Sequence, residues 1–391
     1  MNELNILGRN VSLFDNDFDI IHRSAASNLK KKRVLVIGGG GFIGRSLVKL
    51  LCKFQCEIDV VDISENNLAE LIRSIRSDEE IYKANVKTFI IDVGTSLFNK
   101  FIQSQKPYDY AMNLSAIKHV RSEANFFSLA RMIQTNILNI VDNMTVLQSH
   151  GLKNYFVIST DKAAYPHNIM GATKRLMEKY CIQEAKLDLH LSFARFANVL
   201  FSDGSLSQSY QHRLKMNQPL VAPIDIKRYF ITSDEAGLIC LSSSLFSKNR
   251  HIIVPKMPKN SAITFEEIAR NFLYEQGLKA VVLWDEKAAR NFNFSNKTEQ
   301  WPLLLLETDT TGEKSLEQFF TEKETVINND LNNLLEVSTD RETVASFSDF
   351  KLKFNFLCKR KNSKSDLATL VFSELKSYSY EDLGKYLDEK M

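Results

Sequence analysis

The chain alternates between short apolar runs and longer stretches in which apolar residues recur every three or four positions. The runs have the length of strands that are covered on both faces, and they occupy residues 33–37, 57–62, 87–92, 109–116, 154–160 and 190–199. The stretches between them have helical spacing; a long one covers roughly 124–149, and another covers 170–184. This regular alternation predicts an α/β fold with a doubly wound parallel sheet.

A glycine-rich turn joins the first predicted strand to the helix that follows it. Within GGGGFIG (38–44), Gly38, Gly41 and Gly44 have the spacing GxxGxxG. Glycine lets the backbone turn tightly and approach a pyrophosphate, which the N–H groups of a helix N-terminus can bind. Asp62 ends the second strand, where a carboxylate accepts from both ribose hydroxyls of NAD. We therefore expect a Rossmann-like NAD site; the alternatives are a flexible glycine loop and a helix N-cap at Asp62.

A polar cluster follows the fifth predicted strand. Thr160, Asp161 and Lys162 stand where this strand ends, and Met170 and Lys174 lie one helical turn apart in the next helix. In open parallel sheets, ligands bind at the carboxyl ends of the strands. These residues are therefore the candidates for chemistry, although a surface turn with an ion pair would show the same pattern at Asp161 and Lys162.

The alternation weakens beyond Val199, so a chain of 391 residues should hold more than one unit. Residues 1–32 contain no long periodic segment and are interpreted as an extension packed on the outside. We expect four parts: an N-terminal extension (1–32), an NAD-binding Rossmann domain (33–200), a smaller substrate-binding lobe (201–330) with helices near 234–247 and 265–276, and a C-terminal appendage (331–391) ending in a helix at SYEDLGKYLDEK.

Composition narrows the class of protein. The chain is 44% hydrophobic and 25% charged, as expected of a soluble globular enzyme, and its formal net charge of +3 does not favour nucleic acid. No apolar run approaches the ~20 residues that span a bilayer, and the N-terminus is not a signal peptide.

Five scattered cysteines indicate a reducing compartment. Cys52 and Cys56 fall on one face of a predicted helix without further metal ligands. We expect a cytoplasmic protein without a bound metal.

Several segments together resemble the extended short-chain dehydrogenase/reductases, whose active-site motif is YxxxK. This chain has Met170 at the tyrosine position and Lys174 at the lysine. With that change, the chain resembles the CapD-like UDP-N-acetylglucosamine 4,6-dehydratases of surface-polysaccharide and protein-glycan pathways. The resemblance covers most of residues 6–320 and is carried by ILGR (6–9), VDISENNL (61–68), LSAIKHV (114–120), TNILNI (135–140), STDKA (159–163), MGATK (170–174), ARFANVLFSDGS (194–205), KRYFIT (227–232) and TTGEK (310–314).

The resemblance implies a reaction. NAD oxidises carbon 4 of the sugar, water is eliminated across carbons 5 and 6, and the reduced cofactor then reduces carbon 6. Lys162 is implied as the base at carbon 5 and Asp161 as the acid for the leaving hydroxyl. Lys162 must then lose its proton, which burial or the Lys174 ammonium would favour, and Asp161 must keep its own, which needs an apolar site. Thr160 is implied near the carbon 4 hydroxyl.

The resemblance also implies binding residues. Lys174 should hold the nicotinamide ribose, and Arg228 suits a diphosphate by its charge and planar fork. Asp92 is either an adenine contact or a plain turn aspartate, and His119 alone is more often structural. The cofactor set is Gly38, Gly41, Phe42, Ile43, Gly44, Asp62, Ile63, Ser64, Asp92, Val93, Ser115, Ala116, Lys118 and Lys174; the UDP-sugar set is Lys118, His119, Asn198, Ser205, Arg228 and Glu313.

Three departures from the family pattern leave rival readings open. GGGGF replaces the usual G-A/T-G-S, the segment 121–131 is about two residues longer, and the transmembrane helices of anchored members are absent. Met170 cannot transfer a proton, so water, Thr160 or Asp161 would have to deprotonate the carbon 4 hydroxyl. A nucleotide-sugar 4-epimerase or 4-ketoreductase is one rival, and a non-catalytic NAD-binding protein is another. The family commonly forms homo-oligomers.

Overall fold

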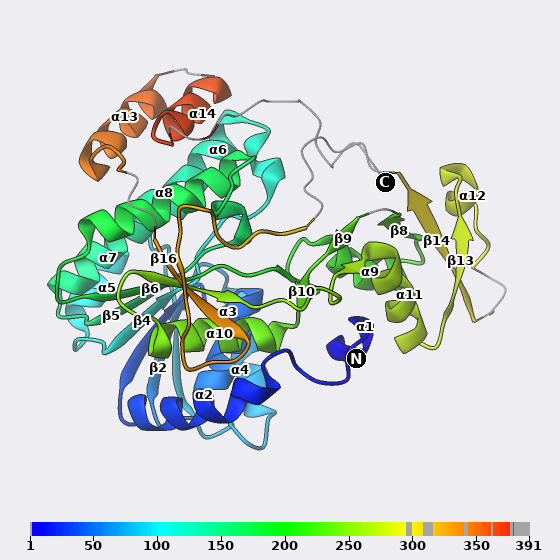
Figure 1. Ribbon diagram of the computed structural model, residues 1–391, viewed down its shortest axis with the longest axis horizontal. Coiled ribbons are helices and arrows are strands. Elements are labelled where there is room, and N and C mark those ends of the chain that lie inside the picture. Colours follow the sequence, from blue (N-terminus) through cyan, green and yellow to red (C-terminus); the bar gives the residue numbers. More distant parts are fainter. Residues whose placement is uncertain are drawn as a thin grey trace.

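The computed structural model describes residues 2–224, 226–294, 299–307, 316–339, 343–360, 363–375 and 378. Its centre is one large sheet made of β1 (Arg33–Ile37), β2 (Glu57–Asp62), β3 (Asn85–Ile90), β4 (Tyr110–Asn113), β5 (Asn154–Ile158), β6 (His190–Ala194), β11 (His251–Pro255), β15 (Val326–Ile327) and β16 (Leu334–Ser338). The strand order is β15-β16-β11-β6-β5-β4-β1-β2-β3 (Figure 1). Strands β1–β6 and β11 run parallel, whereas β15 and β16 pair antiparallel. The predicted doubly wound α/β fold is confirmed.

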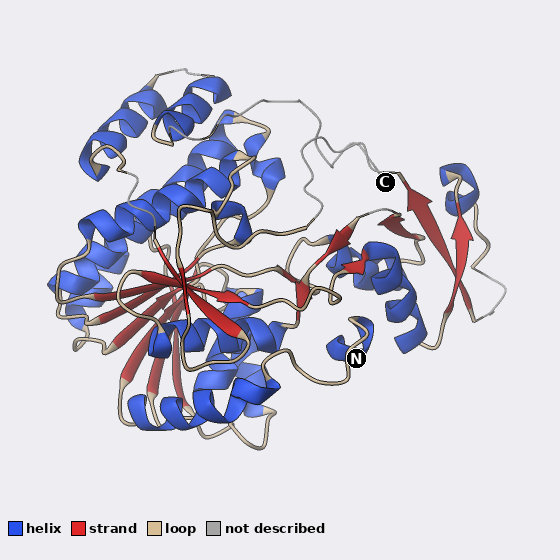
Figure 2. Ribbon diagram, in the orientation of Figure 1, coloured by secondary structure: helices blue, strands red, loops and turns tan. Residues whose placement is uncertain are grey.

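Helices cover both faces of this sheet (Figure 2), which explains why central strands such as β1 and β5 are apolar along most of their length. In β1, the residues from Val34 to Ile37 are buried. One face carries α3 (Phe42–Leu51), α4 (Glu65–Arg76) and α10 (Ser233–Phe246); the other carries α5 (Ser96–Ser104), α7 (Asn139–Ser149) and α8 (Ile169–Glu184). The long helix expected near 124–149 is divided into α6 (Phe126–Ile133), the π-helical turn η2 (Gln134–Leu138) and α7.

The interpretation that residues 1–32 lack a periodic segment was wrong. After the short α1 (Glu3–Ile6), the helix α2 (Asp15–Asn28) packs on α10. Only a narrow stripe of α2 is apolar and buried, at Ile21 and Ala25, while most of the residues of this helix are polar. The stripe also contains the buried Asp17, which accepts from the backbone N–H groups of Asn332 and Asn333. A buried aspartate within so narrow a stripe hides the helical period.

The two neighbouring cysteines do not share a helix. The helix α3 ends at Leu51, Cys52 is its C-cap, and Cys56 directly precedes β2. Both thiols are buried, and burial raises the pKa of Cys52 to about 12 and that of Cys56 to about 11. Thiols held in the protonated form are poor nucleophiles and poor metal ligands. Their contribution is to the packing beneath the first helix.

A smaller lobe stands beside the sheet (Figure 1). It contains a three-stranded parallel sheet of β8 (Leu220–Pro223), β13 (Lys279–Leu283) and β14 (Gln300–Leu306), with α9 (Leu206–Lys215), α11 (Phe265–Glu275) and α12 (Glu286–Arg290). Ile6 and Leu7 from the N-terminal segment complete its apolar core. The pairs β7 (Asn198–Val199) with β10 (Phe230–Ile231), and β9 (Lys227–Arg228) with β12 (Ile263–Thr264), lie between lobe and sheet.

The large sheet crosses the expected divisions of the chain. Strands β11 and β15 come from the range expected for the lobe, and β16 comes from the range expected for the tail. Beyond β16, α13 (Phe347–Lys359) and α14 (Lys364–Ser373) pack against α8. The helix expected at SYEDLGKYLDEK lies outside the described residues.

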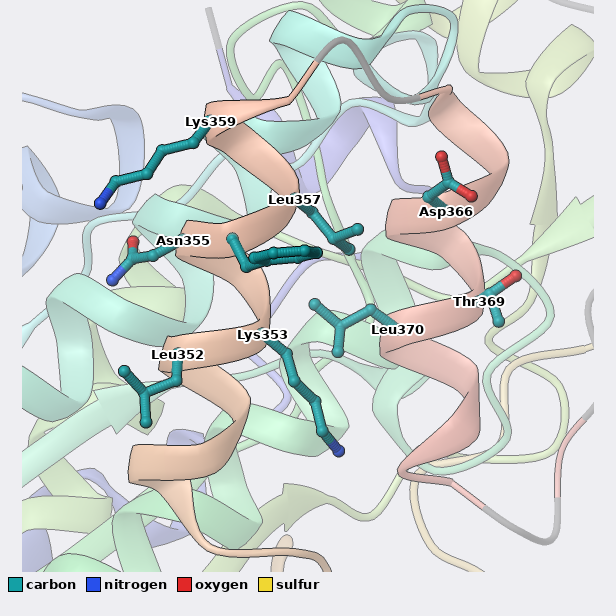
Figure 3. Close-up of a pocket in the computed structure, with 9 residues that line it drawn as sticks. Leu352, Lys353, Asn355, Leu357, Lys359, Asp366, Thr369 and Leu370 are labelled. Carbon is teal, nitrogen blue, oxygen red and sulfur yellow. The ribbon is translucent and has the colours of Figure 1, made fainter.

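A groove of about 810 Å³ lies between α13 and α14 (Figure 3). Its walls include Leu352, Phe356 and Leu370, with Lys353 and Lys359 at its rim. None of its lining residues belongs to the expected site. Among the described residues, no helix combines the length and the apolar content needed to cross a membrane.

Candidate active site

The glycine turn and the polar cluster meet at one edge of the sheet. Strands β1, β4 and β5 are parallel neighbours, so their carboxyl ends point the same way. The glycine turn follows β1, the segment LSAIKHV follows β4, and the Thr160 cluster follows β5. This is the edge at which ligands bind in open α/β sheets. The sequence order of strands and helices alone therefore brings the main candidate residues together.

The glycine turn is a fixed and tightly packed structure. Gly38 has φ of +75°, a conformation that other residues adopt at a cost. A Cβ atom at Gly44 would lie 2.3 Å from the carbonyl oxygen of Gly38. Gly41 is the N-cap of α3, and no side chain caps this helix, so its first N–H groups can receive an anion. This geometry fits a dinucleotide pyrophosphate and disfavours the flexible-loop alternative.

Replacing Gly44 by alanine is expected to weaken NAD binding about ten- to a hundredfold. The added methyl group must push α3 away from the turn, and overpacking of this kind costs roughly 1–3 kcal/mol. The measurement is the dissociation constant of NAD for the purified variant, by calorimetry. Asn66→Ala, on the exposed side of α4, is the matched control. Unchanged affinity in Gly44→Ala would show that the turn does not hold the cofactor.

Asp62 ties the glycine turn to the end of β2. Its Oδ2 accepts from the N–H of Gly40 at 2.9 Å, and its Oδ1 accepts from the N–H of Ser64 at 2.9 Å. The N-cap of α4 is Ser64, whose hydroxyl accepts from Asn67, so the N-cap alternative for Asp62 was wrong. Each carboxylate oxygen keeps a second lone pair for a ribose hydroxyl. Ile63, beside it, is 65% exposed, and the role of both residues toward NAD stays a prediction.

Asp92 has the geometry of a turn aspartate. Its Oδ1 accepts from the N–H of Gly94 at 2.9 Å, and its Oδ2 pairs with Arg131 at 2.9 Å. Arg131 was not expected here, since it lies on α6 and the ion pair joins residues 39 apart. The adenine contact proposed for Asp92 and the cofactor contact proposed for Val93 stay predictions. Ser115 is held by two hydrogen bonds to Asn113 Oδ1.

The polar cluster forms a connected set of hydrogen bonds. The hydroxyl of Thr160 donates to Asp161 Oδ1 at 2.8 Å, and Lys162 Nζ lies 3.2 Å from the same oxygen. Thr160 is the N-cap of the short turn η3 (Asp161–Ala163). The side chain of Asp161 is 9% exposed and that of Lys162 is 40% exposed. The ion pair expected of a plain surface turn is present, but the Asp161 carboxylate is nearly buried and lies at the edge of the sheet where ligands bind.

The helix α8 presents Met170 and Lys174 to this cluster. Met170 is 5% exposed, and its N–H donates to Glu123 Oε1. Lys174 is buried, and its ammonium donates to the carbonyl of Ile158 at the end of β5. Burial lowers the pKa of Lys174 to about 8, against the opposing charge of Glu178. The ammonium is therefore present at neutral pH and is lost above about pH 8.

Asn136 is a site residue that the sequence reasoning did not single out. It lies in the π-turn η2, and such turns are frequent at functional sites. Its Oδ1 accepts from the N–H of Ile117, and its Nδ2 donates to the carbonyl of Ile117 and to Thr173. Asn136 therefore fixes the loop after β4 against α8. Asn136 lies within TNILNI (135–140), one of the segments that carry the family resemblance, and this is the sequence feature that could have identified it.

Lys118 and His119 lie on this loop and face the residues before α9. The ring of His119 packs on Gly204, where a Cβ atom would come within 2.3 Å of Cε1. Desolvation lowers the pKa of Lys118 and that of His119, and the nearby Asp203 opposes both shifts. Ser205 caps α9 by accepting from Gln208. The structure thus brings three of the expected UDP-sugar contacts, Lys118, His119 and Ser205, to one place.

Asn198 and Arg228 meet at a carboxylate that was not expected. Asn198 Nδ2 donates to Glu317 Oε1 at 2.6 Å, and Arg228 Nε lies 3.5 Å from the same atom. Glu317 Oε2 accepts from the N–H of Tyr229. The partners are 119 and 88 residues away in the chain, so no local pattern points to Glu317. Glu313, the expected contact, lies outside the described residues.

These features define an extended short-chain dehydrogenase/reductase of the nucleotide-sugar epimerase and dehydratase type. A family model described as polysaccharide biosynthesis protein matches residues 34–339, and the chain belongs to that family. An uncharacterized membrane protein of Methanocaldococcus jannaschii is 31% identical over 258 residues, which are 63% of this chain and 74% of that protein.

Other relatives carry more specific names. The capsular polysaccharide biosynthesis protein CapD of Staphylococcus aureus is 29% identical over 64% of this chain, and the chain spans only 42% of its length. A UDP-glucose 4-epimerase of Rickettsia bellii is 28% identical over 61% of this chain and 69% of that protein. The relatives therefore include both polysaccharide biosynthesis proteins and named epimerases.

Solved structures share the fold. Pen from Bacillus thuringiensis superposes with a TM-score of 0.64 at 20% identity, covering 85% of this chain and 98% of that chain. WbmG of Bordetella bronchiseptica, solved with NAD and UDP, superposes with a TM-score of 0.51 at 17% identity, covering 71% and 85%. These likenesses establish the Rossmann-like architecture.

Proposed function

We propose that this chain is an NAD-dependent nucleotide-sugar 4,6-dehydratase. The proposed reaction converts UDP-N-acetylglucosamine to a UDP-4-keto-6-deoxy sugar for surface glycan biosynthesis. The observation that carries the proposal is the hydrogen-bonded set of Thr160, Asp161 and Lys162 at the carboxyl end of β5. In this set the proposed acid, Asp161, and the proposed base, Lys162, lie side by side at the edge where the glycine turn lies. Membership of the polysaccharide biosynthesis family supports the pathway.

The side chains have distinct proposed tasks. The glycine turn, Asp62 and Lys174 would hold NAD, which supplies the reversible oxidation at carbon 4 when it is bound. Lys162 removes the proton from carbon 5, and Asp161 delivers a proton to the carbon 6 hydroxyl as it leaves. The hydroxyl of Thr160 positions Asp161 through their 2.8 Å hydrogen bond. The Lys174 ammonium, anchored on Ile158, stabilises negative charge that develops beside it.

A second candidate is a 4-epimerase acting on a similar nucleotide sugar. The named epimerases among the relatives favour it. An epimerase must move a proton at the carbon 4 hydroxyl and does not need a base at carbon 5. A dehydratase must move the same proton, and the buried thioether of Met170 can do so in neither reaction. The pair of Asp161 and Lys162 is needed only for the elimination. The dehydratase is therefore the better-supported function.

One assay separates these functions. The purified protein is incubated with UDP-N-acetylglucosamine in D₂O, and the product is followed by NMR and mass spectrometry. A dehydratase gives a 4-keto-6-deoxy sugar with deuterium at carbon 5, because the proton removed there is replaced from solvent. An epimerase gives a 4-epimer of unchanged mass. Intact substrate after long incubation would refute both enzymatic readings and favour a non-catalytic NAD-binding protein.

The proposed place of action is the cytoplasm, as a homo-oligomer. The five cysteines are free thiols, four of them buried, which suits a reducing compartment. The oligomeric state is an expectation from the resemblance. Light scattering of the purified protein measures it directly.

A further inference from the structure

A buried carboxylate occupies the donors that are expected to bind the substrate. Both hydrogens of the Asn198 amide are used, one by Glu317 Oε1 and one by the carbonyl of Tyr229. Arg228 approaches the same carboxylate at 3.5 Å. The Glu317 side chain is only 4% exposed. An amide N–H and a guanidinium that converge on one carboxylate make an anion site, and here the anion is part of the chain.

The segment that carries Glu317 is held firmly in place. Arg195, which directly follows β6, is buried and donates to the carbonyl of Phe319 and to both oxygens of Glu324. Arg175 on α8 pairs with Glu324 at 2.6 Å. Residues 316–324 are thereby fixed against the active-site helix. For the carboxylate to leave Asn198 and Arg228, the Glu317 side chain must therefore rotate, while residues 316–324 stay in place.

We propose that Glu317 is an internal competitor for the diphosphate of the nucleotide substrate. The inference rests on the proposed function, together with the expectation that Arg228 binds the diphosphate and that Asn198 is a UDP-sugar contact. In the ligand-free protein, Glu317 Oε1 accepts from Asn198 and lies 3.5 Å from Arg228 Nε, so the carboxylate stands where a substrate anion would meet these donors. An incoming diphosphate takes the same donors, and the carboxylate leaves them. The competition lowers affinity for the nucleotide and makes binding dependent on the protonation of Glu317.

The direction of the pH effect follows from the groups around Glu317. These are Asp161 on η3, itself paired with Lys162, and Arg228 on β9. Burial raises the pKa of Glu317; the Tyr229 N–H and Arg228 oppose the shift, and Asp161 adds to it. As the pH falls, a neutral Glu317 holds the donors less strongly. Diphosphate binding should therefore tighten toward low pH and be accompanied by proton uptake.

The test compares UDP binding to the wild type, Glu317→Gln and Glu322→Gln by calorimetry. Gln is isosteric and uncharged, and Glu322 is an exposed carboxylate on the same segment, which makes it the matched control. Titrations in two buffers of different ionisation heat measure protons taken up. UDP and His119 also titrate, but they do so in all three proteins. The difference in proton uptake between the wild type and Glu317→Gln therefore isolates the contribution of Glu317.

We expect Glu317→Gln to bind UDP about tenfold more tightly than the wild type near pH 8, with less proton uptake and with an advantage that narrows as the pH falls. Glu322→Gln should behave as the wild type. Equal affinity and equal uptake, or weaker binding by Glu317→Gln, would overturn the inference and leave the proposed function standing. Failure of all three proteins to bind UDP would overturn the proposed function itself. Glu317→Met serves as a second uncharged variant if Gln impairs folding.

Discussion

Replacing Lys162 by alanine is expected to lower the rate of water elimination by about 10²–10⁴-fold, because a positioned base contributes an amount of this order. Asp161→Asn should have an effect of similar size, since an amide cannot donate the proton that the leaving hydroxyl needs. NAD binding should survive in both variants, because the glycine turn and Asp62 are untouched. The measurement is the rate of deuterium incorporation at carbon 5 in D₂O, with bound NAD quantified in the same preparations.

The same strand offers a matched control. Lys153 directly precedes β5 and pairs with Asp188 at 2.6 Å, with both side chains more than 60% exposed. Lys153→Ala thus removes a lysine of a lysine–aspartate pair at the opposite end of β5, and it should leave elimination unchanged. A double variant of Asp161 and Lys162 that retains full activity would remove the acid–base assignment altogether. Activity restored to Lys162→Ala by added small amines would support the assignment of Lys162 as the base.

Local pattern was sufficient for the six parallel strands β1 to β6 and for the position of the polar residues at their carboxyl ends. The glycine turn was predictable because a strand, three spaced glycines and a helix stand together in the chain. The Thr160 cluster was predictable because it directly follows a buried strand. Each of these signals lies within about twenty residues, and parallel pairing then brings the strand ends together without further information.

The features that were missed depend on contacts between distant segments. Glu317 becomes a site residue only because its segment returns to Asn198, 119 residues away. The strand β16 pairs antiparallel with β11, although residues of the smaller lobe lie between the two strands in the sequence. It therefore does not follow the alternation of parallel strands and helices from which the sheet was predicted. The helix α2 was hidden by the buried Asp17, whose partners are more than 300 residues away. No local pattern identifies these partners.

Replacing Arg195 by methionine is expected to lower the free energy of unfolding by about 3–5 kcal/mol, which is the usual cost of removing one partner from a buried ion pair. Arg195 is buried and pairs with Glu178 at 2.6 Å and with Glu324 at 2.9 Å. Without it, Arg175 is the guanidinium that remains beside the buried Glu178 and Glu324 among the residues that the structure describes. Urea unfolding measures the change. Arg73→Ala, in an exposed pair with Glu70, should change stability by less than about 0.5 kcal/mol.

The pH dependence of unfolding tests whether the charge pairing causes the loss. Burial alone would raise the pKa of Glu324, but Arg195 and then Arg175 outweigh it and lower the pKa to about 2. A carboxyl with a lowered pKa stabilises the fold above its ordinary value of 4.5, and this contribution is lost as the pH falls toward 2. The stability gap between wild type and Arg195→Met should therefore narrow over that range. A gap that stays constant with pH would indicate that Arg195 acts through packing alone, and the segment bearing Glu317 would then not depend on charge for its position.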